Sequence, residues 1–200
     1  KKNKSDKIMI NIVLFGPPGS GKGTQAQNLI KKFNLKQIST GDLFRYNIQN
    51  NTELGELAKS YIDKGELVPD QVTIDMLTDE LKKPCDAQGF IFDGFPRTAT
   101  QTQALEQIVK DVLNSDIDIC LSLIVEDKVL VERLLKRGET SGRTDDSNQE
   151  IISNRIKEYY AKTAEVAELY KQQGKYVEIN GVGAIDEISE KLFAEVEKIK

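Results

Sequence analysis

Histidine is absent from this 200-residue chain, and its two cysteines, Cys85 and Cys120, stand far apart. Without histidine and without a CxxC pair, the chain lacks the ligand set of a Cys/His zinc site. Two isolated cysteines also cannot form the disulfide framework of a small secreted protein. We therefore expect no zinc, and we expect the protein to work in the reducing cytoplasm.

Long hydrophobic runs are missing as well. The longest, IMINIVLF at residues 8–15, contains Asn11. A membrane-spanning helix needs about 20 mostly apolar residues, so no membrane association is expected. The basic stretch KKNKSDK before this run is a poor match to a secretory signal, because the apolar run leads straight into a glycine-rich loop. With 38% hydrophobic and 30% charged residues, the composition is typical of a soluble globular protein.

The chain has no excess of positive charge. Its net charge is −4 and its pI is about 5.1, whereas a nucleic-acid-binding surface is usually basic, so no nucleic-acid partner is expected. Only six of its 28 basic residues are arginine, and the N-terminal tail and the final helix carry lysine alone. Arginine's planar fork suits phosphate and carboxylate groups, which predicts an anionic ligand. The six are Arg45, Arg97, Arg133, Arg137, Arg143 and Arg155.

Short apolar runs alternate with longer amphipathic ones, which favours an α/β fold with a parallel sheet covered by helices on both faces. Ligands of such sheets bind beyond the carboxyl ends of the strands. Helices are predicted over residues 25–32, after VPD as far as Pro84, and along an apolar stripe from Ile185 to Ile199. Two segments, 39–68 and 136–146, interrupt the alternation. The predicted strands are 8–15, 36–39, 89–93, 117–125 and 175–179.

A phosphate-binding loop is predicted at GPPGSGKGT, residues 16–24. It matches G-x-x-x-x-G-K between a predicted strand and a predicted helix, which makes an incidental glycine-rich turn the weaker alternative. Backbone amides and the helix N-terminus would bind phosphate, and Lys22 would reach the outer phosphates. Gly23 stands where serine or threonine usually binds magnesium, and the hydroxyl comes one residue later, at Thr24.

A phosphate loop by itself leaves a GTPase, a motor-type ATPase and a small-molecule phosphotransferase open. The GTPase strings NKxD and DxxG both occur, as NKSD at 3–6 and DAQG at 86–89. The first precedes the phosphate loop and the second lies before its strand instead of at its end. We interpret both as chance matches.

The motifs GPPGSGKGTQA, ISTGDLFR, GELVPD, GFIFDGFPRT, RLLKRGETSGRTDD and NRIKEYY appear in the order typical of adenylate kinases. The chain resembles that family from about Ile10 to its C-terminus. The resemblance implies a doubly wound, five-stranded parallel sheet with a phosphate loop, its core formed by 1–38, 69–135 and 147–200. It also implies a helical AMP-binding insert at 39–68 and a short lid at 136–146. The stretch RGETSGRTDD in this lid has no apolar residue, so we expect it to stay out of the core.

The resemblance also implies the binding and catalytic residues. The implied ATP-binding residues are Gly19, Ser20, Gly21, Lys22, Gly23, Thr24, Arg133, Arg137 and Gly183. The implied AMP-binding residues are Thr40, Arg45, Glu66, Leu67, Val68, Gly94, Phe95, Pro96, Arg97, Gln101, Arg143 and Arg155. Phosphoryl transfer would depend on Lys22, Arg97, Arg133, Arg137, Arg143 and Arg155. Asp42 and Asp93 would hold Mg²⁺ through water.

The implied reaction is ATP + AMP ⇌ 2 ADP, catalysed by a monomer. A UMP/CMP kinase of the same family is the nearest alternative, and a nucleotide-binding regulatory protein without turnover is a more distant one. UMP/CMP kinases usually have alanine in place of Thr40 and asparagine in place of Thr98, so both positions favour AMP. Gln101 would read adenine with its amide, although a flipped amide would match uracil instead.

Overall fold

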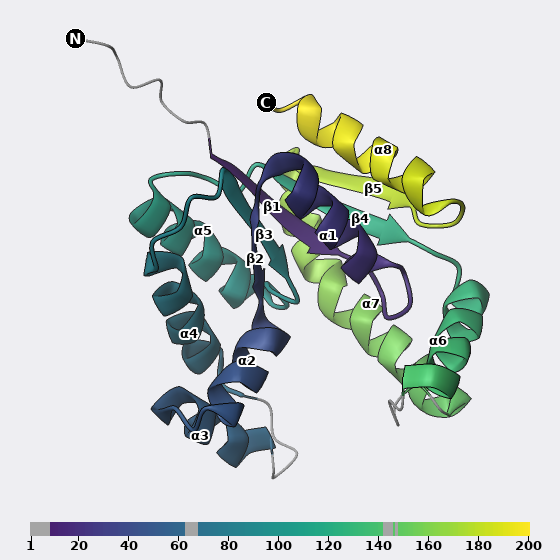
Figure 1. Ribbon diagram of the computed structural model, residues 1–200, viewed down its shortest axis with the longest axis horizontal. Coiled ribbons are helices and arrows are strands. Elements are labelled where there is room, and N and C mark those ends of the chain that lie inside the picture. Colours follow the sequence, from purple (N-terminus) through teal and green to yellow (C-terminus); the bar gives the residue numbers. More distant parts are fainter. Residues whose placement is uncertain (1–8, 63–67, 142–145, 147) are drawn as a thin grey trace.

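The computed structural model describes residues 9–62, 68–141, 146 and 148–200. Its sheet has five strands in the order β2-β3-β1-β4-β5, and each neighbouring pair is parallel, so that Leu14 lies beside both Asp93 and Leu121 (Figure 1). The expected α/β class and parallel sheet are confirmed. The strands are β1 (Ile10–Phe15), β2 (Lys36–Ser39), β3 (Gly89–Asp93), β4 (Ile119–Ile124) and β5 (Tyr176–Asn180).

The strands agree closely with the sequence prediction. The bounds of β2 and β3 match it, and the other three strands differ from it by one or two residues at their ends. All six residues of β1 are buried, and four of the five in β3 are buried. Burial on both faces is why these strands read as continuous apolar runs without alternation.

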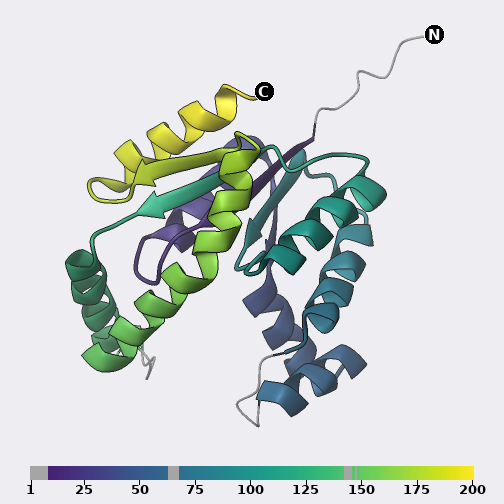
Figure 2. The ribbon, with the colours of Figure 1, turned by 180° about the vertical axis from the view of Figure 1, so that it is seen from behind.

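Helices cover both faces of the sheet (Figures 1 and 2). Alternate residues of β1 pack in different clusters. Ile12 and Leu14 pack in the cluster that contains α1 (Lys22–Phe33) and α8 (Ile185–Glu197). Val13 and Phe15 pack in the cluster on the other face. The helices of that second cluster are α4 (Asp70–Lys82), α5 (Ala99–Leu113) and α7 (Gln149–Gln172).

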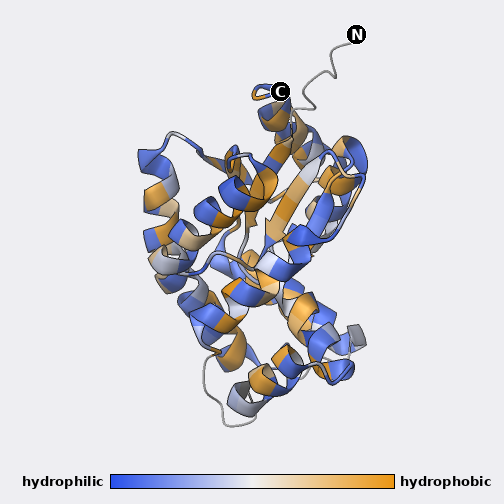
Figure 3. Cartoon of the chain, turned by 90° about the vertical axis from the view of Figure 1, so that its left-hand side faces the viewer, coloured by the Kyte–Doolittle hydropathy of each residue, from blue (hydrophilic) through white to orange (hydrophobic). Residues whose placement is uncertain are grey.

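Figure 3 shows hydrophobic residues gathered between the sheet and its helices, with hydrophilic residues on the outer helical turns. In α8 the predicted apolar stripe is buried at Ile188, Leu192 and Val196. Its two outer members, Ile185 and Ile199, are exposed. None of the described helices is long and apolar enough to cross a membrane.

Two helical arms extend beyond the carboxyl ends of the strands (Figures 1 and 2). In one arm α2 (Thr40–Gln49) packs against α3 (Glu53–Ile62). In the other, α6 (Asp127–Ser141) packs against the first half of α7 around Leu130, Leu134 and Ile152. The arms correspond to the two segments that interrupt the strand–helix alternation in the sequence, although residues 136–141 continue α6 as helix instead of beginning a separate segment.

Candidate active site

The loop from β1 to α1 turns sharply at two glycines. Gly19 has φ 83° and Gly21, the N-cap of α1, has φ 86°, in the left-handed region that glycine adopts without strain. A side chain at Gly19 would also collide with α6, because its Cβ would lie 2.9 Å from Leu134 Cγ. The loop therefore passes close to α6 and ends at the positive end of the α1 dipole, where a phosphate is favoured.

Next to this loop is a cavity of about 610 Å³ at the carboxyl ends of the strands. The loop residues Gly16 to Thr24 form one wall, and Gly94, Pro96 and residues of α6 and α7 form the others. Cationic side chains from several different elements line it, so the fold concentrates positive charge in a protein whose net charge is −4. These side chains are Lys22, Arg97, Arg133, Arg137, Arg155 and Lys162.

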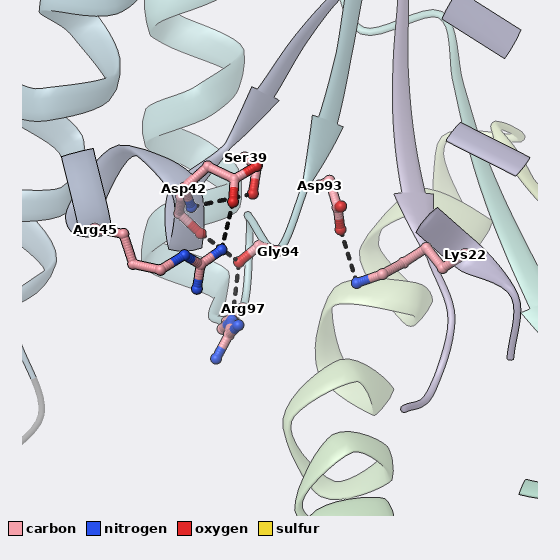
Figure 4. A network of polar contacts seen from close by, with 8 residues as sticks. Lys22, Ser39, Asp42, Arg45, Asp93, Gly94 and Arg97 are labelled. Atoms are coloured by element: carbon pink, nitrogen blue, oxygen red, sulfur yellow. Dashed lines mark hydrogen bonds and ion pairs between the residues drawn. The ribbon is translucent and has the colours of Figure 1, made fainter. Parts of the chain in front are cut away.

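Lys22 and Asp93 form an ion pair across the ends of two neighbouring strands (Figure 4). Lys22 Nζ lies 2.7 Å from Asp93 Oδ1, and the two side chains are 30% and 15% exposed. Lys22 begins α1 directly after the phosphate loop, and Asp93 ends β3 beside β1. The pair keeps a cation at the mouth of the loop and a carboxylate within reach of whatever that cation binds.

Asp42 lies on the other side of the view in Figure 4, in the first turn of α2. Its backbone N–H donates to Ser39 Oγ at 3.3 Å, and its carboxylate pairs with Arg45. Carboxylate oxygens of Asp42 and Asp93 are the ligands that Mg²⁺ prefers, and Mg²⁺ usually keeps several waters beside substrate phosphates. Among the described residues no cluster of three or more Asp, Glu, Cys or His side chains could hold a metal ion. Both carboxylates are oxygen donors of the kind that Mg²⁺ binds, and each is paired with a cation, Asp93 with Lys22 and Asp42 with Arg45.

Asp146 is fully buried between two arginines. Arg137 donates from Nε to Oδ2 at 2.6 Å and from Nη2 to Oδ1 at 3.0 Å. Arg155 donates from Nη1 to Oδ1 at 2.8 Å. The hydrogen bonds from Arg137, together with those from Arg155, outweigh the opposing effect of burial and hold the pKa of Asp146 below its ordinary value. The two guanidinium groups are thereby joined at the cavity wall by one carboxylate.

The structure corrects our expectation that RGETSGRTDD stays out of the core at one described residue, Asp146. Residues 137–141 are the last turns of α6, and the Asp146 side chain is 0% exposed. A carboxylate can be buried when it is paired and hydrogen-bonded, which the two arginines achieve. Gly138 permits this approach, since a Cβ there would lie 2.6 Å from the Asp146 carbonyl oxygen.

Arg133 connects two loops that carry proposed ATP-binding residues. It donates from Nη1 to Gly19 O at 3.3 Å and from Nη2 to Gly181 O at 3.1 Å. Backbone carbonyl oxygens of two separate loops therefore accept the hydrogen bonds of Arg133. Gly183, two residues beyond Gly181, has φ 127° and lies outside the cavity lining.

Several of the proposed AMP-binding residues lie around the end of β3. Arg97 donates from Nε to Gly94 O at 2.8 Å, and Thr40 donates from Oγ1 to the same carbonyl at 3.3 Å. Phe95 is buried, and Pro96 lines the cavity. Neither Thr40 nor Arg45 lines the cavity.

Three predicted site residues, Glu66, Leu67 and Arg143, lie outside the described residues, and Val68 is half-buried at their edge. Gln101 is buried, and both atoms of its amide have protein partners: Arg97 N donates to Oε1 at 2.8 Å, and Nε2 donates to Asp70 Oδ1 at 2.7 Å.

Sequence reasoning missed the wall that α7 adds to the cavity. Glu158, Tyr159, Lys162 and Thr163 line it together with Arg155. Burial raises the pKa of the Tyr159 phenol. The signal was present in the sequence, because these positions lie three, four, seven and eight residues after Arg155 and therefore share its helical face.

Comparison with known proteins agrees with this geometry. A sequence model described as adenylate kinase matches residues 14–175. The adenylate kinase of Flavobacterium psychrophilum is 52% identical over 184 residues, covering 92% of this chain and 96% of that protein. The adenylate kinase of Flavobacterium johnsoniae is 49% identical over 191 residues, covering 96% of this chain and all of that protein. The adenylate kinase of Parabacteroides distasonis is 46% identical over 192 residues, covering 96% of this chain and all of that protein. The chain belongs to the adenylate kinase family.

Proposed function

We propose that this protein catalyses the reversible transfer of the ATP γ-phosphoryl group to AMP, giving two ADP. The observation that carries this proposal is the cavity at the strand ends, where a phosphate loop faces arginines from several elements. Two polyanionic nucleotides repel each other, and charge-assisted hydrogen bonds from arginine and lysine offset that repulsion. Membership of the adenylate kinase family supports the same reaction.

In this proposal, transfer needs positioning and charge stabilisation, and it needs no side-chain base. The AMP phosphate that attacks is already ionised at neutral pH, which agrees with a chain that has no histidine. Lys22 and the phosphate loop would bind the ATP phosphates, and Arg97 with Arg45 would bind the AMP phosphate. Arg133, Arg137, Arg143 and Arg155 would stabilise the charge on the transferring group.

Mg²⁺ would arrive with ATP and, when bound, would neutralise charge on the phosphate oxygens. Asp93 and Asp42 would orient its water shell, consistent with Gly23 standing where a direct hydroxyl ligand is usual. Lys22 would then exchange part of its contact with Asp93 for contact with phosphate. The protein is proposed to act as a monomer in the cytoplasm.

We also propose that the chain is divided into a core, an AMP-binding insert and a lid. Residues 1–38, 69–135 and 147–200 would form the core, 39–68 the AMP-binding insert and 136–146 the lid. The Arg137–Asp146–Arg155 cluster supports a lid whose positive charge is partly neutralised before nucleotides bind. On closure these arginines would contact phosphate and exclude the water that could hydrolyse ATP.

A coupled assay of ADP formation with a panel of acceptors tests this function. We expect AMP to be preferred over UMP, CMP and GMP by about ten- to a hundredfold in kcat/KM. Gln101→Ala should reduce that preference mainly by weakening the use of AMP. Equal or better use of UMP or CMP by the unchanged protein would favour the UMP/CMP kinase alternative, and no ADP formation with any acceptor would favour a regulatory nucleotide-binding protein.

A further inference from the structure

The side-chain amide of Gln101 is held between two helices. Its Oε1 accepts from the backbone N–H of Arg97 at 2.8 Å, just before α5 begins. Its Nε2 donates to Oδ1 of Asp70 at 2.7 Å, in the first turn of α4. The backbone N–H of Gln101 donates to Thr98, the N-cap of α5. Gln101 is only 8% exposed, so these contacts are made largely away from solvent.

The two partners permit only one orientation of the amide. A backbone N–H can only donate, and an ionised carboxylate can only accept. If the amide were reversed, its NH₂ group would face the Arg97 N–H and its oxygen would face the Asp70 carboxylate. A donor would then face a donor, and an acceptor would face an acceptor. Both mismatches would be buried, where polar groups without partners are disfavoured. The assignment therefore follows from the chemistry of the neighbours.

A fixed amide can distinguish between bases. After these bonds Gln101 still has its second N–H and the second lone pair of its oxygen. Adenine presents an amino group that donates beside a ring nitrogen that accepts. Hypoxanthine, the base of inosine monophosphate (IMP), has the same size and the reverse pattern, a carbonyl beside a ring N–H. Only a reversed amide could pair with that pattern.

We propose that Asp70 is a positioning residue that selects the acceptor base by fixing the orientation of Gln101. The inference rests on the proposed function, in which Gln101 contacts the base of AMP. It assigns to Asp70 the rejection of monophosphates whose base has a carbonyl beside a ring N–H, namely IMP, GMP and UMP. CMP presents the same donor–acceptor pattern as AMP, so its rejection depends on the space available to a smaller base.

AMP and IMP form the matched pair of acceptors for the test, and Asp70→Asn is the variant. Asparagine keeps the shape of aspartate but can both accept and donate, so this partner no longer opposes the reversed amide of Gln101, and only the Arg97 N–H still does. At saturating ATP we expect the ratio of kcat/KM for AMP to that for IMP to fall about fivefold or more. The change should lie in KM, and calorimetric titration without ATP should show the same loss of discrimination.

Asp75→Asn is the matched control. Asp75 lies on the same helix and accepts from a glutamine amide, Gln71 Nε2, at 2.7 Å, but on the exposed surface. This variant should leave the ratio unchanged. Asp70→Ser, whose hydroxyl also both donates and accepts, is a second variant and should lower the ratio as well. In a Gln101→Ala background, Asp70→Asn should have no further effect on the ratio.

Two results would overturn the proposal. One is an unchanged ratio in folded Asp70→Asn and Asp70→Ser, and an equal loss for AMP and IMP within that result would indicate that Asp70 only stabilises α4. The other is an undiminished effect of Asp70→Asn without Gln101. Failure of the proposed function is distinguishable, since the unchanged protein would then form no ADP from ATP and AMP.

Discussion

At the residue scale, the charged side chains of the site already have partners before a ligand binds. Lys22 contacts Asp93, Arg137 and Arg155 contact Asp146, and Arg133 contacts backbone carbonyls. Ligand phosphates would replace or share these contacts. Substitution of a residue in a partly exposed pair should therefore lower activity with little loss of stability. Substitution of a residue in a buried pair should lower the free energy of unfolding as well.

Lys22→Ala should lower kcat by about 100-fold or more, because this ammonium would stabilise phosphate charge during transfer. Its ion pair is partly exposed, and such pairs contribute at most about 1 kcal/mol, so the melting temperature should change by less than about 4 °C. Steady-state kinetics and calorimetry measure the two quantities. Lys31→Ala, an exposed position on the same helix, serves as the control. Activity of Lys22→Ala within a few-fold of the unchanged protein would contradict the phosphate-loop assignment.

Asp146→Asn should reduce stability in a pH-dependent way. The folded pKa of Asp146 is depressed, mainly by hydrogen bonds from Arg137. The charge therefore stabilises the fold above the unfolded-state pKa of about 4, and this contribution is lost as pH falls through the folded pKa. At pH 7 we expect Asp146→Asn to lower the free energy of unfolding by about 1.5–3 kcal/mol.

Urea unfolding of both proteins at pH 7 and pH 3 measures this effect. The difference in the free energy of unfolding between the unchanged protein and Asp146→Asn should be smaller at pH 3, because that pH is closer to the lowered pKa of Asp146. Asp111→Asn removes an exposed carboxylate that accepts from Gln107, and it should show little difference at either pH. If Asp146→Asn lowered the free energy of unfolding equally at pH 7 and pH 3, the charge of Asp146 would not be the cause of the loss.

At the scale of elements, the α2–α3 arm depends on one close approach. Gly55 in α3 lies so near to α2 that a Cβ there would be 2.0 Å from the carbonyl oxygen of Asn47. A backbone atom cannot move away as the end of a side chain can. Any larger residue at Gly55 must therefore push α3 away from α2.

Gly55→Ala should raise KM for AMP more than KM for ATP, because the proposed AMP-binding insert would be distorted while the phosphate loop stays intact. Overpacking of this kind costs about 1–3 kcal/mol of stability. Initial-rate kinetics with each nucleotide varied in turn gives both KM values. Ser60→Ala changes an exposed side chain of the same helix and should alter neither. Equal increases in the two KM values would count against a separate insert.

At the scale of the whole molecule, the question is whether any metal belongs to the protein or only to its substrate. Within the described part of the chain there is no cluster of metal-ligating side chains, and histidine is absent from the sequence. We expect chelation with EDTA to abolish turnover and excess Mg²⁺ to restore it. The melting temperature of the nucleotide-free protein should not change with the chelator. Elemental analysis that found one zinc per chain would contradict this prediction.

The sequence by itself was sufficient for the strands and for the family. Two of the five strands were predicted with the observed bounds, and the remaining three to within two residues at each end. The phosphate loop was recognisable because its glycines, Lys22 and the flanking strand and helix are close together along the chain. The family was predicted from ordered motifs and is confirmed by the comparisons.

Only the tertiary structure decided which distant groups meet. The Gln101–Asp70 contact joins positions 31 residues apart, and the contacts of Arg133 with Gly19 and Gly181 span 114 and 48 residues. The burial of Asp146 could not be predicted from its polar surroundings in the sequence. Whether a carboxylate enters the interior depends on the cations that surround it in space, because pairing and hydrogen bonding offset the loss of solvation. Local sequence patterns determine helices, strands and loops, but the partners of a buried charge are determined by how those elements pack.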